Sequence, residues 1–118
     1  MQDAHKFAKA WIDAWNSHDL DVILSHYADD IEITTPMIKI TLGVGDGSLK
    51  GKEAVGAYWK KALEKMPDLH FELYEVTEGV NSVGLYYKSV MNKKAVEVMF
   101  FNPEGKVNKM IALYTDSI

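Results

Sequence analysis

The sequence predicts an α+β domain in which helices precede an antiparallel sheet. Apolar residues recur at helical spacing in three segments before residue 67, with one strand inserted among them. After that position the apolar residues alternate as they do in strands. Helices that are segregated from consecutive strands are typical of the α+β class, and 118 residues fit a single domain that spans 1–118.

Two helices are predicted at the start of the chain. Residues 4–15 carry a single apolar stripe. A short second helix begins after Asp19, which fits an N-cap, and continues to Tyr27. The acidic pair at 29–30 is expected to end this helix and to be solvated there.

A strand, a loop and a third helix follow. Residues 31–35 alternate apolar and polar side chains, which predicts a strand with one solvated face, and 38–42 predict a second short strand. The glycine-rich segment 43–48 lacks the ending of a phosphate-binding loop, so it predicts a surface loop or a lid over a pocket. The third helix spans 52–66 and ends before Pro67, because proline cannot continue a helix.

Four strands are predicted in the rest of the chain. Residues 95–102 and 107–114 form a hairpin around a turn at 103–106. The two earlier strands are predicted from residues that share a face, namely Leu69, Phe71 and Leu73 in one and Val83, Leu85, Tyr87 and Met91 in the other.

Both faces of the last hairpin are apolar. In residues 95–101 one parity carries Val96 and Val98, while the other carries Glu97 and Met99. A sheet with one solvated face would alternate more cleanly, and the helices can cover only one of the two faces. The sequence therefore predicts a homodimer through an outer face that includes Val98, Phe100, Ile111 and Leu113.

The inner face is unusually aromatic, which indicates either a large packed core or a cavity. Aromatic rings with a few polar groups between them form the kind of site that binds small organic molecules. The candidate ligand-binding residues are Trp11, Trp15, Tyr27, Thr35, Tyr58, Trp59, Phe71, Tyr87, Met99, Phe101, Met110 and Tyr114.

Composition argues against several functions. The chain has no cysteine, which excludes disulfides and thiolate chemistry. All 13 basic residues are lysines and the net charge is −4, so a nucleic acid is not expected as a partner. The four histidines form no ligand pair, so no metal or other cofactor is expected. The apolar runs are too short for a membrane span and the start does not resemble a signal peptide, which predicts a cytoplasmic protein.

Several motifs of the chain resemble the NTF2-like superfamily, which includes SnoaL-like polyketide cyclases and ketosteroid isomerases. AWNSHDLD at 14–21, YADD at 27–30 and Thr-Pro at 35–36 are similar to its opening, and GKEAV at 51–55 and FNPEGKV at 101–107 to its third helix and last hairpin. The resemblance covers nearly the whole chain. It implies a cone-shaped, curved antiparallel sheet wrapped around three N-terminal helices, with an internal pocket and frequent dimers, but no single function.

The resemblance to ketosteroid isomerase concerns three positions. That enzyme uses a carboxylate base, with a tyrosine and a protonated aspartic acid as its oxyanion hole. The resemblance places Thr35 at the base, Trp11 at the tyrosine and Glu97 at the protonated acid. Threonine cannot usefully accept a proton from carbon at neutral pH and indole is not acidic, so ketosteroid isomerisation by that mechanism is not expected.

Glu97 is the candidate catalytic residue, because it is the only charged residue on its parity of the strand. In a dry pocket its pKa would rise well above the free value of about 4.3, and it could act as an acid, a base or a hydrogen-bond donor. The alternative is an ionised carboxylate at the mouth of the pocket or in a salt bridge with a lysine such as Lys88.

The expected function is binding of a small, largely apolar and uncharged molecule. Any catalysis is expected to be cofactor-independent proton transfer of the isomerase, cyclase or dehydratase type. Glu97 would act as acid or base, with hydrogen bonds donated by Trp11, Tyr58, Tyr87 and Tyr114. Two alternatives stay open: a non-catalytic carrier or sensor with the same pocket, and a protein-interaction module of the same fold.

Overall fold

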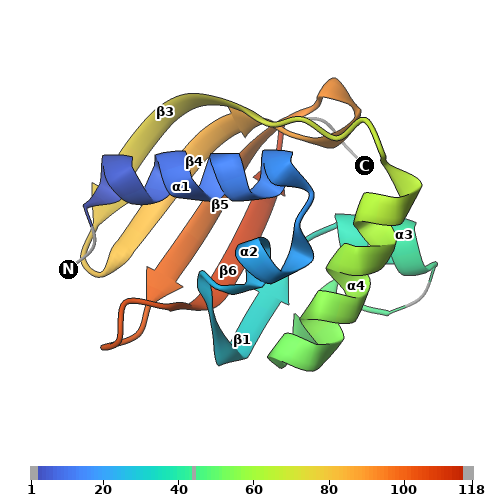
Figure 1. Ribbon diagram of the computed structural model, residues 1–118, viewed down its shortest axis with the longest axis horizontal. Helices are drawn as coiled ribbons and strands as arrows, with labels where there is room; N and C mark the ends of the chain where they lie inside the picture. The colour runs from blue at the N-terminus through green and yellow to red at the C-terminus, as the bar shows by residue number, and fades with distance from the viewer. Residues whose placement is uncertain (1–2, 44, 116–118) are drawn as a thin grey trace.

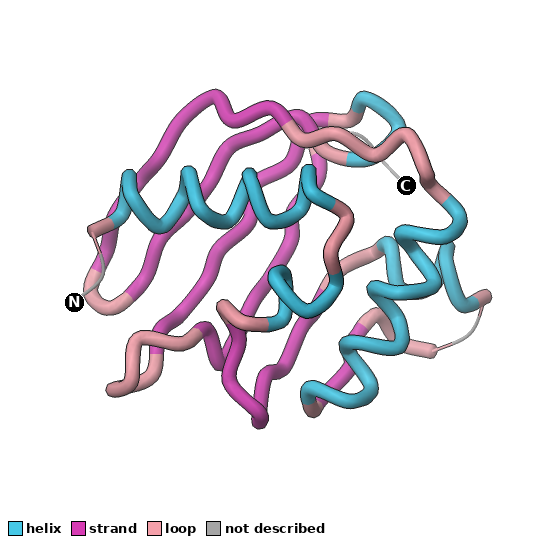
Figure 2. The backbone as a smooth tube through the Cα atoms, viewed as in Figure 1, coloured by secondary structure: helices cyan, strands magenta, loops and turns pink. Residues whose placement is uncertain are grey.

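The computed structural model describes residues 3–43 and 45–115. A curved sheet carries helices on its concave side (Figures 1 and 2). The helices are α1 (Ala4–Ser17), α2 (Leu20–Leu24), α3 (Met37–Leu42) and α4 (Lys52–Lys65), with a 3-10 turn, η1 (Val90–Asn92). The strands are β1 (Tyr27–Thr34), β2 (Ser48–Lys50), β3 (Glu72–Gly79), β4 (Ser82–Lys88), β5 (Lys94–Phe101) and β6 (Val107–Tyr114).

The six strands form one sheet in the order β2-β1-β6-β5-β4-β3. The predicted run of four antiparallel strands, β3 to β6, is confirmed. Strand β1 pairs in parallel with β6, so the predicted antiparallel sheet contains a parallel pair. The chain crosses from β1 to β6 through all the intervening elements, which leaves room for the parallel pairing.

The predicted parity of the last hairpin is confirmed over most of its length. Glu97 and Met99 are buried on the concave side, while Phe100 and Leu113 are exposed on the convex side. Val107 shares the strand parity of the outer residues Ile111 and Leu113, but it is fully buried. A register shift between Phe100 and Phe101 explains this difference, because a bulge reverses the side that the following residues face.

The first two helices begin where the sequence predicts. Asp3 caps α1 by accepting a hydrogen bond from the Lys6 backbone N–H at 3.0 Å. Asp19 caps α2 in the same way, accepting from the backbone N–H groups of Asp21 and Val22. Between the two helices, His18 adopts a left-handed conformation with φ of 61°, which turns the chain sharply.

The predicted end of the second helix is wrong. The helix ends at Leu24, and Tyr27 is the first residue of β1. Asp29 and Asp30 lie inside this strand, where the register shifts between Tyr27 and Glu32. The irregular segment lets both carboxylates reach solvent while Tyr27 stays buried.

Residues 38–42 form part of helix α3, so the predicted strand there is also wrong. Met37, Ile38 and Thr41 are buried on one side of α3, which is helical spacing rather than alternation. Met91 was expected to share a strand face with Tyr87, but it lies in η1 and is 56% exposed.

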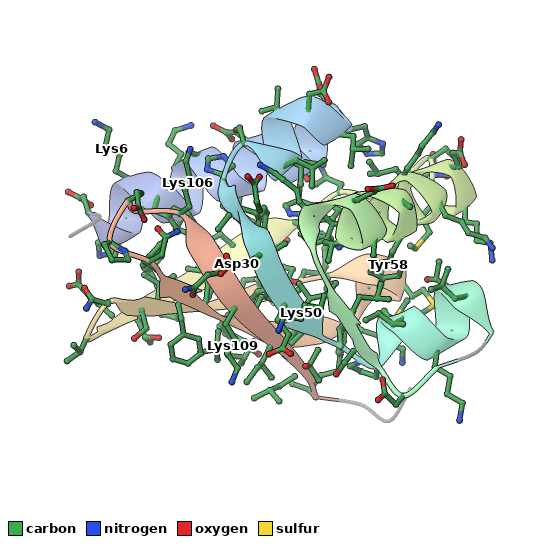
Figure 3. The ribbon with its side chains drawn as sticks, turned by 90° about the horizontal axis from the view of Figure 1, so that it is seen from below. Lys6, Asp30, Lys50, Tyr58, Lys106 and Lys109 are labelled. Carbon is green, nitrogen blue, oxygen red and sulfur yellow. The ribbon has the colours of Figure 1, made fainter. Side chains whose placement is uncertain are left out.

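The third predicted helix is confirmed as α4, and it supplies the second wall of the interior. Val55, Tyr58 and Trp59 are buried on the side of α4 that faces the sheet. Seen from below, α1, α2 and α4 lie on one side of the sheet, and Tyr58 extends from α4 toward it (Figure 3). Among the described residues, no helix is long and apolar enough to cross a membrane.

Candidate functional site

A cavity lies between the concave face of the sheet and the helices α1 and α4. About 50 Å³ of it is open to the centres of water molecules, which is room for several waters or for part of a small organic molecule. Its walls are formed by Trp11, Trp15, Thr35, Met37, Tyr58, Trp59, Ala62, Met66, Leu69, Phe71, Tyr87, Ser89, Val90, Glu97, Met110, Ala112 and Tyr114.

Most of the residues proposed from the sequence line this cavity, but three do not. Tyr27 is 1% exposed and lies behind the wall, where its hydroxyl contacts Trp11. Met99 is fully buried in the core. Phe101 follows the bulge and packs edge-to-face against Phe7, with 4.9 Å between the ring centroids. These three residues support the fold rather than the cavity surface.

Glu97 reaches the cavity from the middle of β5 and is only 4% exposed. Its Oε1 accepts a hydrogen bond from the Tyr87 hydroxyl at 2.9 Å. The salt bridge to Lys88 that the sequence allowed is not formed, because Lys88 pairs instead with Glu72 at 3.4 Å. Burial raises the pKa of Glu97 to about 7, although the hydrogen bond from Tyr87 opposes the rise.

Four tyrosine hydroxyls lie within electrostatic range of Glu97. Burial is the largest cause that raises the pKa of each, and the charge of Glu97 raises it further; the pKa of Tyr114 reaches about 12. These hydroxyls therefore stay protonated throughout the range in which Glu97 titrates. They belong to Tyr27, Tyr58, Tyr87 and Tyr114.

The indole N–H groups of α1 differ in their partners. Trp11 Nε1 donates to the Tyr27 hydroxyl at 2.8 Å, so Trp11 is not free to donate to a ligand as the sequence suggested. Trp15 Nε1 is buried and has no hydrogen-bond partner among the described residues. It lies close enough to Tyr27 to lower the pKa of that hydroxyl, without reaching hydrogen-bond geometry. Trp15 is therefore a buried donor at the cavity wall with unused capacity.

A second polar group lies where β6 ends. The hydroxyls of Ser89 and Tyr114 are 3.2 Å apart, and either can donate to the other. Thr35 is buried nearby, and its Oγ1 accepts a hydrogen bond from the Met37 backbone N–H at 3.2 Å. Thr35 therefore brings a hydroxyl and not a carboxyl group to this part of the cavity wall.

A second hollow adjoins the cavity beside the turn that connects β4 to β5. The two share four lining residues, which are Met66, Leu69, Ser89 and Val90. The outer rim of the second hollow includes Lys65 and Asp68. The described residues of the glycine-rich segment 43–48 do not line the cavity, and Val44 lies outside the described residues. Gly43 caps the end of α3, and Ser48 begins β2.

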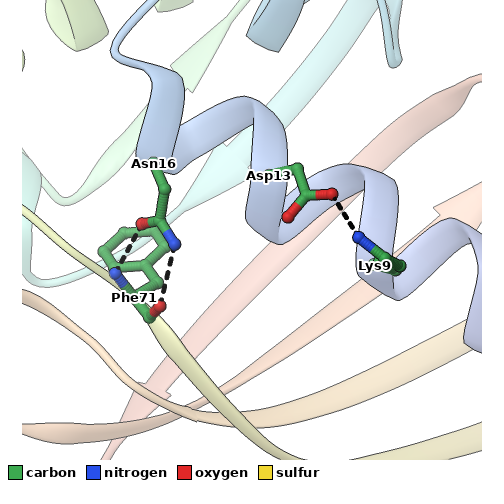
Figure 4. Close-up of polar contacts among 4 residues, drawn as sticks. All are labelled: Lys9, Asp13, Asn16 and Phe71. Carbon is green, nitrogen blue, oxygen red and sulfur yellow. Dashed lines mark hydrogen bonds and ion pairs between the residues drawn. The ribbon is translucent and has the colours of Figure 1, made fainter.

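Asn16 ties the end of α1 to the segment that closes one side of the cavity (Figure 4). Its side-chain amide donates to the Phe71 carbonyl at 3.0 Å and accepts from the Phe71 N–H at 2.7 Å. Two residues before Phe71, the carbonyl oxygen of Leu69 lies 2.7 Å from His18 Nε2. These contacts hold Leu69 and Phe71 against the cavity although they precede strand β3.

Sequence reasoning missed seven of the lining residues. Ala62 and Met66 lie on the apolar stripe predicted for the third helix, so that stripe could have identified them. Met37 is the first residue of α3 and lies just before the segment 38–42 that was predicted as a strand. Ser89 and Val90 lie where the alternation of β4 stops, and no periodic signal marks them. The other two are Leu69 and Ala112.

The described residues contain no group of three or more histidine, aspartate or glutamate side chains that could hold a metal ion. Among the described residues, the cavity walls carry one carboxyl group, several hydroxyls and one indole N–H without a hydrogen-bond partner, and most of the remaining wall is aromatic or aliphatic. Such a site can hold a small organic molecule and exchange a proton with it.

Comparison with known proteins places this architecture in a family. The model of the SnoaL-like domain matches residues 8–115. A SnoaL-like protein of unknown function from Burkholderia thailandensis is 50% identical, with a TM-score of 0.89 over 96% of this chain and 95% of that chain. No curated protein sequence matches the chain.

More distant structures share the fold alone. A candidate isomerase of the SnoaL-like family from Agrobacterium tumefaciens is 16% identical, with a TM-score of 0.77 over 98% of this chain and all of that chain. An NTF2-like protein of unknown function from Cytophaga hutchinsonii is 13% identical, with a TM-score of 0.72 over 97% of this chain and 91% of that chain. Because a family model covers most of its length, the chain belongs to the SnoaL-like domain family.

Proposed function

We propose that this protein binds a small, largely apolar molecule in the cavity and that Glu97 exchanges a proton with it. The reaction class would be cofactor-independent isomerisation, cyclisation or dehydration. The observation that supports this proposal is a single carboxyl group, 4% exposed, at the wall of an aromatic cavity and without a cationic partner among the described residues.

The electrostatics of the site support an acid–base role. A group with a pKa of about 7 is present in both protonation states near neutral pH, which is the condition for efficient general acid–base catalysis. Tyr87 holds one carboxylate oxygen in place through its hydrogen bond. Tyr58 and Tyr114 stay neutral and can donate hydrogen bonds to a ligand oxygen.

The proposal is tested with 5-nitrobenzisoxazole, a general probe for a base in an apolar site. The carboxylate would take the proton from the ring carbon while the N–O bond breaks, and the resulting nitrophenolate is coloured. We expect a rate above background that rises with pH and levels off above about pH 7, where Glu97 is ionised.

Two variants make this test specific. Glu97→Gln should reduce the rate to background, whereas Glu104→Gln should leave it unchanged, because Glu104 is exposed in the β5–β6 turn and does not line the cavity. A Glu97→Gln protein that is folded and as active as the unaltered chain would refute a proton-transfer role for Glu97.

A non-catalytic carrier or sensor is the second candidate function. Two donors at the cavity already make hydrogen bonds within the protein, because Trp11 donates to Tyr27 and Tyr87 donates to Glu97. A catalyst would direct such donors at its substrate, so these bonds favour a carrier or sensor. In that case the protein would bind small aromatic molecules and co-purify with one, detectable by native mass spectrometry, without accelerating the elimination.

A further inference from the structure

We propose that the cavity selects an organic cation: a small, largely apolar amine whose nitrogen pairs with Glu97 between aromatic rings. This inference rests on the proposed function, because it names the chemical class of the ligand for the same cavity. It begins from the charges around the site.

Among the described residues that line the cavity there is one acidic side chain and no basic one. Of the described residues that line it, only Glu97 carries a side chain that can be charged near neutral pH. The nearby lysines have other partners: Lys88 pairs with Glu72, and Lys65 donates to the Thr41 carbonyl at 2.8 Å on the rim. An anionic ligand would therefore meet a like charge and no cation, whereas a cationic ligand would meet a desolvated partner.

The walls add an attraction that favours cations over neutral molecules. Seven of the lining residues are aromatic. They include two edge-to-face pairs. The ring centroids are 5.1 Å apart in Trp15 and Trp59, and 5.2 Å apart in Trp11 and Tyr87. The faces of aromatic rings are negative and attract ammonium groups, most strongly where water is excluded. Aromatic walls alone accept any apolar molecule, but aromatic walls with an unpaired carboxyl group favour a cation.

Binding of an amine requires no proton donor or acceptor other than the amine and Glu97. A neutral amine that enters takes the proton from a protonated Glu97, so that an N–H bond forms as the carboxyl O–H bond breaks. An amine that enters already protonated pairs with the ionised carboxylate. The other titratable groups that face Glu97 are the hydroxyls of Tyr27, Tyr58, Tyr87 and Tyr114, and all of them stay neutral.

Benzylamine and benzyl alcohol provide a test, because they have nearly the same shape and differ in charge. By calorimetry at pH 8, we expect benzylamine to bind at least about tenfold more tightly than benzyl alcohol, the preference of a desolvated cation–π and ion-pair site. Lowering the pH from 7 to 5 should weaken benzylamine binding by about fiftyfold, because the proton then competes for Glu97, and should not weaken benzyl alcohol binding.

The variant Glu97→Gln should remove the preference for benzylamine and retain benzyl alcohol binding, whereas Glu104→Gln should keep the preference. The comparison of the two ligands on the unaltered chain needs no variant, so a folding defect in Glu97→Gln would not obscure the answer. Equal affinity for both ligands would overturn the amine inference and leave the proposed function standing. Failure of both ligands to bind, with no elimination of 5-nitrobenzisoxazole, would overturn both.

Discussion

Glu97 makes folding stability depend on pH in an unusual direction. Its pKa is about 7 in the folded chain, against 4.5 for the free group. Between these values the folded state holds a proton that the unfolded chain releases, so the free energy of unfolding falls as pH rises from about 4.5 to 7. The difference is about 3 kcal/mol by linkage, present in full below pH 4.5 and lost above pH 7.

Glu97→Gln removes this dependence. A neutral amide can still accept a hydrogen bond from the Tyr87 hydroxyl, so we expect the variant to be more stable than the unaltered chain at pH 8. Between pH 4.5 and pH 8 the difference in unfolding free energy between the two proteins should shift in favour of the variant by up to about 3 kcal/mol. Urea unfolding of both proteins at the two pH values measures this change. A stability difference that does not vary with pH would mean that the carboxyl group has an ordinary pKa.

Tyr87 tunes the same carboxyl group. Its hydroxyl stabilises the ionised form, so Tyr87→Phe should raise the pKa of Glu97 by about one unit, the effect of one hydrogen bond to a charge. The rise of the 5-nitrobenzisoxazole rate with pH should move upward by the same amount. Tyr74→Phe, at an exposed tyrosine on β3, is the control and should not shift the profile; an unshifted profile in Tyr87→Phe would remove Tyr87 from this role.

At the scale of elements, the contact between α1 and the Leu69–Phe71 segment is the connection that shapes the cavity. Asn16→Ala leaves both backbone groups of the buried Phe71 without their partner, so it should destabilise the fold by about 1–3 kcal/mol. Asp13→Ala breaks only the exposed 2.7 Å pair with Lys9 on the same helix and should cost less than about 0.5 kcal/mol. Equal losses in chemical denaturation would show that the Asn16 contact does not hold this segment.

The sequence predicts those elements whose pattern is set by their own side chains. Helices α1 and α4 and the hairpin of β5 and β6 have long apolar patterns, and the inward position of Glu97 follows from strand parity. The segment Ile38-Lys39-Ile40-Thr41 also alternates apolar and polar residues, which is why a strand was predicted there. Its helical conformation in α3 depends on packing against α4, which the sequence pattern does not reveal. Ser89 was missed because no pattern reveals that a turn closes over the cavity.

At the scale of the whole molecule, we propose that the convex face of the sheet pairs with a second copy. Val98 lies opposite Ile111 and Val96 opposite Leu113 on this face, while Phe100 and Leu113 are 37% and 55% exposed. Two such faces buried together would remove apolar surface from water, which drives the association of identical subunits.

Leu113→Lys should therefore convert a dimer into a monomer in sedimentation experiments, because it places a charge within the apolar face. Val80→Lys is the matched control: Val80 is 89% exposed between β3 and β4, outside this face, and its substitution should leave the dimer intact. If the unaltered chain sediments as a monomer, the convex face has no such partner.

The ionisation of Glu97 is the property on which both the acid–base role and the selection of a cation depend. An NMR titration of its side-chain carboxyl carbon, assigned by comparison with Glu97→Gln, measures that property directly. Because Glu97 is buried and has no cationic partner among the described residues, we expect a midpoint near pH 7. A midpoint at or below the free value of 4.5 would mean that the carboxylate is solvated or paired with a cation, and would contradict the whole interpretation of the cavity.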